Sequence, residues 1–296
     1  MRVSVVSLGT WQFGGEWGRS FTASEVDNIM GRAQELGINF VDTAECYGDH
    51  LSEALVGQAL AGRRQAWHVA TKFGHRYAGH MQRQNLFSGD EVRRQLEASL
   101  GALQTDTIDL YQFHSGSDAQ FDDDALWTML NKQVEAGKVR HLGVSVSSKR
   151  YPMHQIQRAQ GVGASVIQIV YNRLERGPES LALPACQLHD LGVLARVPLA
   201  SGFLSGKYRP GETFTLADDL RSGFPADEVQ HTLLEVQRIA ETEVPPGVPM
   251  AGWALAWCLH HPAVTCVIPG CKDVMQLELN ASAARLVDDA HPQAVA

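Results

Sequence analysis

Short apolar runs rich in β-branched residues alternate along the chain with segments whose apolar residues recur at helical spacing. Several of the helical segments have recognisable boundaries, with Ser24, Ser52 and Ser88 as expected N-caps and Gly37 as an expected stop. The apolar runs predict strands at Val3–Leu8, Ile38–Asp42, His68–Phe73, Thr107–Phe113, His141–Ser145, Val166–Val170, Val193–Val197 and Thr265–Ile268. This alternation indicates the α/β class, with a parallel sheet and crossover helices.

Chain length and the lack of a dinucleotide-binding motif favour a closed barrel over an open doubly wound sheet. Dividing 296 residues by eight strands gives 37 residues per unit, which suits a barrel of about 250 residues with insertions. An open doubly wound sheet should carry G-x-G-x-x-G after its first strand, but the nearest partial match, Gly161–Ala164, lacks the third glycine and precedes a strand. We therefore predict a single (β/α)₈ TIM barrel domain spanning residues 1–296.

Composition narrows the range of partners. The net charge is −8 without a cluster of Lys or Arg, which argues against nucleic acid and anionic membranes. No apolar run approaches the roughly 20 residues that a membrane span requires. The five cysteines lack paired-ligand spacing and predict reduced thiols in the cytoplasm. The histidines show no convincing metal spacing, so no metal is predicted. A small molecule is the expected partner, and the oligomeric state is not indicated.

Four ionisable residues stand where barrel enzymes place their chemistry. Asp42, Lys72 and His114 each close a predicted strand, and Tyr47 follows Asp42 by five positions. A phenol with a pKa of about 10 is a poor proton donor at neutral pH. An adjacent lysine would lower that pKa, and an aspartate would keep the lysine charged and in place. With His114 orienting a carbonyl group, the set predicts a carbonyl reductase.

Each of these residues also has an ordinary interpretation, as a turn residue, a half-buried aromatic or a strand-end charge. Their shared position at the ends of consecutive strands favours the functional interpretation. Aromatic residues after the first and third strands could line an apolar pocket beside the carbonyl, and these are Trp11, Phe13 and Phe73.

The motifs around these residues resemble those of the aldo-keto reductase superfamily over nearly the whole chain. The similar segments are Phe40–Gly48, Ser52–Glu53, Leu55–Gly57, Thr71–Lys72 and Phe113–His114. The resemblance implies that Asp42, Tyr47, Lys72 and His114 form a catalytic tetrad. It also implies that Tyr47 donates the proton, that a reduced nicotinamide donates hydride, and that the reverse alcohol oxidation is possible.

Further segments resemble the cofactor site of the same family. Gly143–Ser145 and Gln168–Asn172 imply contacts to the nicotinamide carboxamide, although Val146 stands where asparagine is usual. Pro198–Tyr208 implies a pyrophosphate site, and the segment after the eighth strand implies an adenosine site. Lys272 could neutralise a 2′-phosphate, which favours NADPH while leaving NADH possible. The implied cofactor residues are Ser145, Gln168, Pro198, Leu199, Ser201, Gly202, Leu204, Ser205, Lys207, Gly270, Lys272, Gln276 and Asn280.

Two other functions remain open at the level of sequence. A strand-end lysine such as Lys72 could form a Schiff base in an aldolase, although pairing with Asp42 would raise its pKa. The family resemblance also covers channel-associated subunits that sense the nucleotide and turn over slowly. The physiological carbonyl compound is not indicated.

Overall fold

Eight parallel strands form one sheet in the computed structural model, which describes residues 1–147, 151–217 and 219–287. In sheet order the strands are β1 (Leu8–Gly9), β2 (Phe40–Asp42), β3 (His68–Phe73), β6 (Ile108–His114), β7 (Val139–Ser145), β8 (Ala164–Val170), β9 (Gly192–Arg196) and β10 (Cys266–Val267). Parallel bridges from Val6 to Val267 and from Gly9 to Gly270 join the first strand to the last. The sheet therefore closes into the predicted barrel.

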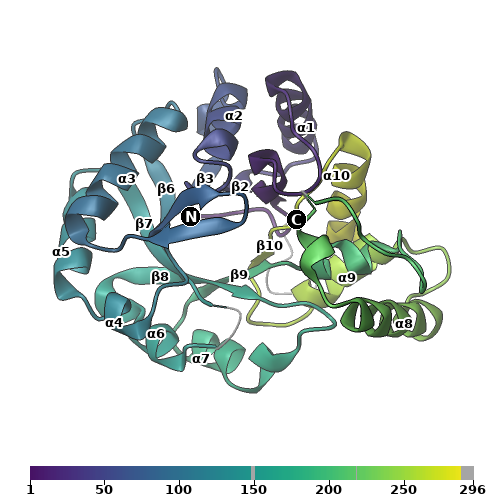
Figure 1. Cartoon of the computed structure of the whole chain (residues 1–296). Coiled ribbons are helices and arrows are strands. Elements are labelled where there is room, and N and C mark those ends of the chain that lie inside the picture. Colours follow the sequence, from purple (N-terminus) through teal and green to yellow (C-terminus); the bar gives the residue numbers. More distant parts are fainter. Residues whose placement is uncertain (148–150, 218, 288–296) are drawn as a thin grey trace.

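Helices surround the strands on all sides (Figure 1). The α-helices are α1 (Ala23–Glu35), α2 (Leu51–Ala59), α3 (Gly89–Ala102), α4 (Asp118–Phe121), α5 (Asp124–Glu135), α6 (Met153–Arg158), α7 (Ala182–Leu188), α8 (Ala226–Thr242), α9 (Met250–Leu259) and α10 (Val274–Ala281). The 3₁₀ turns are η1 (Trp11–Gly14), η2 (Arg64–Ala66), η3 (Gln160–Val162), η4 (Gly177–Ser180), η5 (Ala200–Ser205), η6 (Leu220–Gly223) and η7 (Ser282–Arg285). In the described part of the chain, no helix is both long and apolar enough to cross a membrane.

The predicted helix boundaries are partly correct. Ser88 is the N-cap residue of α3, and Gly37, at φ 81°, follows the last turn of α1. The cap of α1 is Thr22 instead of Ser24, because Thr22 forms a reciprocal capping box with Glu25. Ser52 lies inside α2, where its hydroxyl donates to the Thr10 carbonyl at 2.9 Å. That serine serves a tertiary contact, which its position in the sequence does not reveal.

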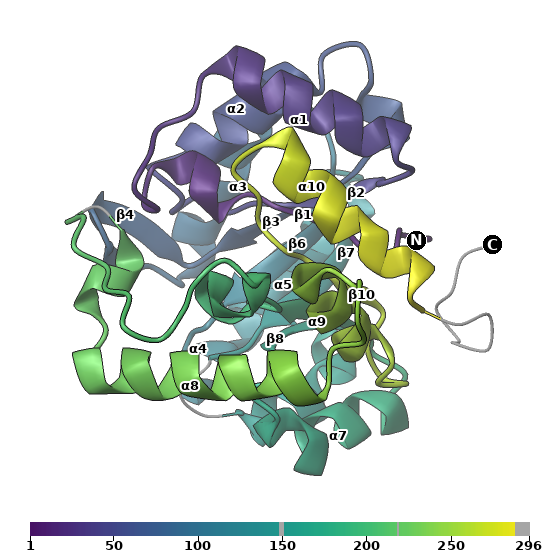
Figure 2. The ribbon, with the colours of Figure 1, turned by 90° about the vertical axis from the view of Figure 1, so that its right-hand side faces the viewer.

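An antiparallel hairpin between β3 and α3 was not predicted. It consists of β4 (His75–Gly79) and β5 (Gln82–Asn85), whose polar sequence lacks a strand-like alternation. Figure 2 shows β4 beyond the end of the barrel strands. Glu16 ties the hairpin to the loop after β1, since it accepts hydrogen bonds from Trp11 Nε1, the Met81 amide and Arg83. The hairpin is therefore held beside the mouth of the barrel.

The interior of the barrel is filled by an apolar layer contributed by several strands. Its members are Phe40, Ala70, Leu110, Leu194, Cys266 and Ile268, with Val166 packed against them. A second, larger core lies between the strands and the surrounding helices. Side chains two positions apart on a strand share a face, so the next inward residue on each strand lies directly above this layer, toward the carboxyl end.

Candidate active site

A polar layer lies above the apolar layer at the carboxyl end of the barrel. It is built from Asp42, Lys72, Gln112, Gln168 and Arg196, each standing two residues after an apolar interior residue on its own strand. In TIM barrels this end of the strands carries the catalytic groups. The alternation of the strands thus places one acidic, two basic and two amide side chains in the same layer.

Lys72 and Asp42 form a buried ion pair at the centre of this layer. Lys72 Nζ lies 2.5 Å from Asp42 Oδ1 and also donates to the Thr43 carbonyl at 2.8 Å. The other carboxylate oxygen of Asp42 accepts from Gln168 Nε2 at 2.8 Å and Gln112 Nε2 at 3.1 Å. Both oxygens are satisfied, which a buried carboxylate requires.

The third donor contact of Lys72 goes to Tyr47, whose hydroxyl oxygen lies 3.1 Å from Nζ. Tyr47 stands in the turn between β2 and α2. Its ring stacks on Trp11, with centroids 5.9 Å apart and an interplanar angle of 20°. Gly14 packs against the Tyr47 backbone so closely that an added Cβ would lie 2.6 Å from the Tyr47 carbonyl carbon. The phenol is therefore positioned from two sides.

The pKa of Tyr47 is not lowered, as the sequence analysis expected from an adjacent lysine. Burial raises the pKa of Tyr47 above its ordinary value, and the opposing effect of Lys72 does not outweigh burial. Burial alone would lower the pKa of Lys72, but Asp42 and Tyr47 together raise it. At neutral pH the site therefore holds a protonated phenol beside a charged ammonium group.

His114, at the end of β6, is a neutral imidazole in this site. Burial lowers its pKa well below the usual value, and the nearby His75 and Lys72 act in the same direction. Its Nδ1 lies 3.9 Å from Cys46 Sγ, and its ring meets that of His75 edge to face with centroids 4.8 Å apart. Burial also raises the pKa of the Cys46 thiol to about 11, so that group is protonated and behaves as an apolar neighbour.

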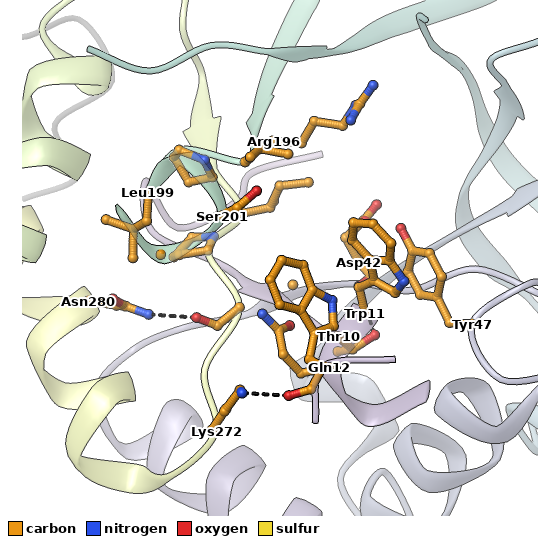
Figure 3. A pocket seen from close by; sticks show the side chains of 18 of the residues that line it. Thr10, Trp11, Gln12, Asp42, Tyr47, Arg196, Leu199, Ser201, Lys272 and Asn280 are labelled. Carbon is orange, nitrogen blue, oxygen red and sulfur yellow. Dashed lines mark hydrogen bonds between the residues drawn. The ribbon is translucent and has the colours of Figure 1, made fainter. Parts of the chain in front are cut away.

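A cavity of about 540 Å³ opens from Asp42, Tyr47 and His114 toward α10. Figure 3 shows Asp42 and Tyr47 on one side of it and Lys272 with Asn280 on the other. Most of the predicted cofactor residues line this cavity, namely Gln168, Pro198, Leu199, Ser201, Gly202, Ser205, Lys207, Gly270, Lys272, Gln276 and Asn280. Trp11, predicted for the substrate pocket, lines it as well.

Five predicted site residues do not line the cavity. One is Lys72, which is buried and donates to Asp42, Thr43 and Tyr47. Phe13 and Phe73 are core residues, packed against Phe21 at 4.9 Å and Tyr111 at 4.8 Å between ring centroids. Leu204 is fully buried in a separate apolar cluster, and Ser145 is buried with its hydroxyl 3.4 Å from Gln168 Oε1. The two phenylalanines belong to the apolar core between the strands and the surrounding helices.

Several site residues were missed by the sequence prediction. Arg196 lines the cavity, and the buried Gln112 donates to Asp42. Both stand at alternate positions on predicted strands, which was a usable signal. Arg83 and Trp17 come from the hairpin and the loop after β1, and nothing in their local sequence indicates that they meet. Their position depends on the tertiary contacts of Glu16.

The end of the cavity near α10 suits a ligand with several phosphate groups. Burial lowers the pKa of Lys272, and the neighbouring cations Arg221, Lys207 and Arg19 add to the effect. In the described part of the chain, Arg221 is paired with Asp219 at 2.7 Å, whereas Lys272 Nζ forms no ion pair and donates to the Trp17 carbonyl oxygen at 2.6 Å. This excess of positive charge would be relieved by a bound anion.

The loop beside these cations carries a strained backbone. Ala200 and Ser201 have φ angles of 47° and 57°, in a region that side chains other than glycine rarely adopt. Gly202 follows at 91°. Backbone strain of this kind clusters at ligand sites, and successive amides turned in such a loop can face an anion. The donor set therefore fits a dinucleotide with its phosphates near Lys207 and Lys272.

No group of three or more His, Cys, Asp or Glu side chains placed to hold a metal ion occurs in residues 1–147, 151–217 and 219–287. The site instead combines a tyrosine hydroxyl beside a buried lysine ammonium group with a cation-lined cavity. Together, fold and site define a (β/α)₈ barrel whose polar residues and cavity lie at the carboxyl ends of the strands, where barrel enzymes carry their catalytic groups.

Comparison with known proteins gives the family. Residues 5–294 match the model of the aldo/keto reductase family, and the chain belongs to that family. It is similar to the uncharacterized oxidoreductase YrpG of Bacillus subtilis, with 33% identity covering 94% of this chain and 86% of YrpG. It is also similar to the aldo-keto reductase yakc [NADP(+)] of Schizosaccharomyces pombe, with 30% identity covering 87% of this chain and 77% of the relative. Among solved structures, glycerol dehydrogenase AKR11B4 of Gluconobacter oxydans superposes with a TM-score of 0.81 and 31% identity, covering 98% of this chain and 93% of the other.

Proposed function

We propose that this protein is an NADPH-dependent reductase of aldehydes or ketones in which Tyr47 is the proton donor. The observation that carries the proposal is the contact between the Tyr47 hydroxyl, which belongs to a residue that lines the cavity, and the buried Lys72 ammonium group 3.1 Å away. Membership of the aldo/keto reductase family supports the reaction class, and the NADP(+) in the name of the yeast relative supports the cofactor.

The chemistry requires a hydride donor and a proton donor on the same carbonyl group. When bound, the reduced nicotinamide supplies a hydride to the carbonyl carbon. The π electrons of the C=O bond then move to oxygen, and the Tyr47 hydroxyl gives that oxygen its proton. Lys72 stabilises the phenolate left behind, and Asp42 keeps Lys72 charged and in place. Neutral His114 can donate one hydrogen bond to the substrate oxygen without losing a proton.

The cations near α10 support NADPH over NADH. Lys207 and Arg19, which is also paired with Glu25, both lower the pKa of Lys272 by charge repulsion. A 2′-phosphate adds about two negative charges and would offset this repulsion at Lys272. Arg19 comes from the loop before α1 and donates to the Lys272 carbonyl at 3.0 Å. It supplies an arginine that the segment after the eighth strand itself lacks.

The test is NADPH oxidation, followed by absorbance, with a reactive aromatic aldehyde. Tyr47→Phe should reduce kcat at least about 100-fold while leaving NADPH affinity within about twofold. Tyr111→Phe is a matched control, because Tyr111 is buried and its hydroxyl has no hydrogen-bond partner within residues 1–147, 151–217 and 219–287. Wild-type turnover in Tyr47→Phe would refute the proposed proton donor.

Neither alternative function is favoured. An aldolase lysine needs a free amine, yet Lys72 donates to three oxygens and its pKa is raised by Asp42. Borohydride reduction in the presence of an aldehyde should therefore trap no adduct on Lys72. A nucleotide-sensing protein would bind NADPH tightly in the same assay and show almost no turnover.

A further inference from the structure

Arg196 is a charged residue of the site that the proposed chemistry does not use. It closes β9 and lies in the polar layer with Asp42 and Gln168. One of its terminal nitrogens donates to the Val146 carbonyl at 3.1 Å, while its Nε is buried and has no hydrogen-bond partner among the residues that the structure describes. The side chain lines the cavity. A buried donor without a partner is costly, so this guanidinium group is available to a ligand.

The charges around the cavity leave Arg196 without a carboxylate of its own. In the described part of the lining, Arg83 pairs with Glu16 and Arg221 pairs with Asp219. Asp42 attracts Arg196 electrostatically but is bonded to Lys72. The two lysines that line the cavity, Lys207 and Lys272, lie at its opposite end, where the phosphate groups are proposed to bind. Arg196 is thus an uncompensated positive charge at the end where Tyr47 lies.

Strand pairing places this charge above Gln168. Arg196 is opposite Val170 in the β8–β9 pair, and its guanidinium group crosses β8 to reach the end of β7. The Val146 amide in turn donates to the Gln168 carbonyl at 2.9 Å. Figure 3 shows the Arg196 side chain pointing away from Lys272 and Asn280. If Gln168 holds the nicotinamide, as the resemblance to the aldo-keto reductases implies, Arg196 stands beside the ring.

We propose that Arg196 faces the nicotinamide ring and makes the site discriminate by charge, binding the neutral reduced ring in preference to the cationic oxidised ring. The oxidised ring carries a positive charge, and the reduced ring does not. A fixed cation in a water-poor site repels the oxidised form through Coulomb's law and leaves the reduced form almost unaffected. The same repulsion assists release of the oxidised product. This inference rests on the proposed function and adds a specificity-determining residue to it.

The experiment measures the dissociation constants of NADPH and NADP⁺ by quenching of tryptophan fluorescence, which Trp11 and Trp17 in the cavity wall make sensitive to binding. The Kd ratio of NADP⁺ to NADPH should fall about tenfold in Arg196→Met, equivalent to about 1.4 kcal/mol. It should be largely retained in Arg196→Lys, which keeps the charge. Lys207→Met, at the phosphate end, should weaken both forms by a similar factor.

An unchanged ratio in Arg196→Met would overturn the inference. If Arg196→Met at the same time raised KM for a carboxylate-bearing benzaldehyde relative to a neutral one, Arg196 would be a substrate anchor instead. Failure of the wild type to bind either nucleotide would instead overturn the proposed function. Arg196→Gln, which keeps a polar group at the position, provides a second neutral variant should Arg196→Met fail to fold.

Discussion

Replacing Lys72 with methionine tests the electrostatic reasoning at the centre of the site. The change removes an ammonium group 3.1 Å from the Tyr47 hydroxyl while keeping most of the side-chain volume. At that distance and an effective dielectric constant of about 20, a unit charge stabilises the phenolate by about 5 kcal/mol. Neighbouring donors and water recover part of this stabilisation. We therefore expect the activation free energy to rise by about 4 kcal/mol, which is a loss of about 10³-fold in kcat.

The pH dependence of the reverse reaction separates this effect from a general loss of activity. Alcohol oxidation requires the Tyr47 phenolate, and Lys72 opposes the rise in the Tyr47 pKa that burial causes. Without the ammonium group, the pKa of Tyr47 should be higher still. The rising limb of the profile of kcat against pH should therefore move to higher pH in Lys72→Met.

The Lys72→Met variant needs a control for lost folding stability, because removing one partner of a buried ion pair costs about 3–5 kcal/mol of the free energy of unfolding. Arg64→Met breaks the pair of Arg64 with Asp109, 2.7 Å apart, near the amino end of β6 and away from the cavity. It should lower the free energy of unfolding but leave kcat unchanged. A folded Lys72→Met protein with kcat within tenfold of wild type would refute the reasoning.

Three further predictions concern positioning, pH and cofactor choice. Gly14→Ala should lower kcat at least tenfold, since its Cβ would displace the Tyr47 backbone, whereas Gly101→Ala, where an added Cβ meets nothing within 4 Å, should keep wild-type kinetics. Burial raises the pKa of Glu45 to about 7 from 4.5, so the folded state binds its proton more tightly and wild-type stability should fall as pH rises between these values. At pH 8 the free energy of unfolding of Glu45→Gln should therefore exceed that of wild type by about 1–3 kcal/mol, with no difference near pH 4.5. An equal difference at both pH values would contradict this. Lys272→Met should weaken NADPH about tenfold and NADH less than about twofold, and equal losses would exclude a role at the 2′-phosphate.

The periodicity of the sequence was enough to predict the barrel and the ends of its strands. The predicted and observed bounds of β3 agree at His68–Phe73, because a buried parallel strand is rich in apolar and β-branched residues and this run stops at Phe73, before Gly74. Asp42, Lys72 and His114 were found for the same reason. The first strand is shorter than predicted, with ladder pairing at Leu8–Gly9 and an isolated bridge at Val6.

Other features depended on contacts between segments far apart in the chain. The polar hairpin β4–β5 has no local strand signal, and it is held in place by the bonds between Glu16 and Arg83. Phe13 and Trp11 are two residues apart in one short turn, yet one is in the core and the other lines the cavity.

The sequence by itself determined which residue types stand at the carboxyl ends of the strands, since local apolar periodicity sets where each strand ends. The tertiary structure decided how those residues act on one another. Barrel closure brings Gln112 and Gln168 to the carboxylate of Asp42 and carries Arg196 across β8 to Val146. Burial then raises the pKa of Tyr47 and lowers that of His114. Charge interactions depend on distance and on exclusion of water, and both are properties of the folded barrel.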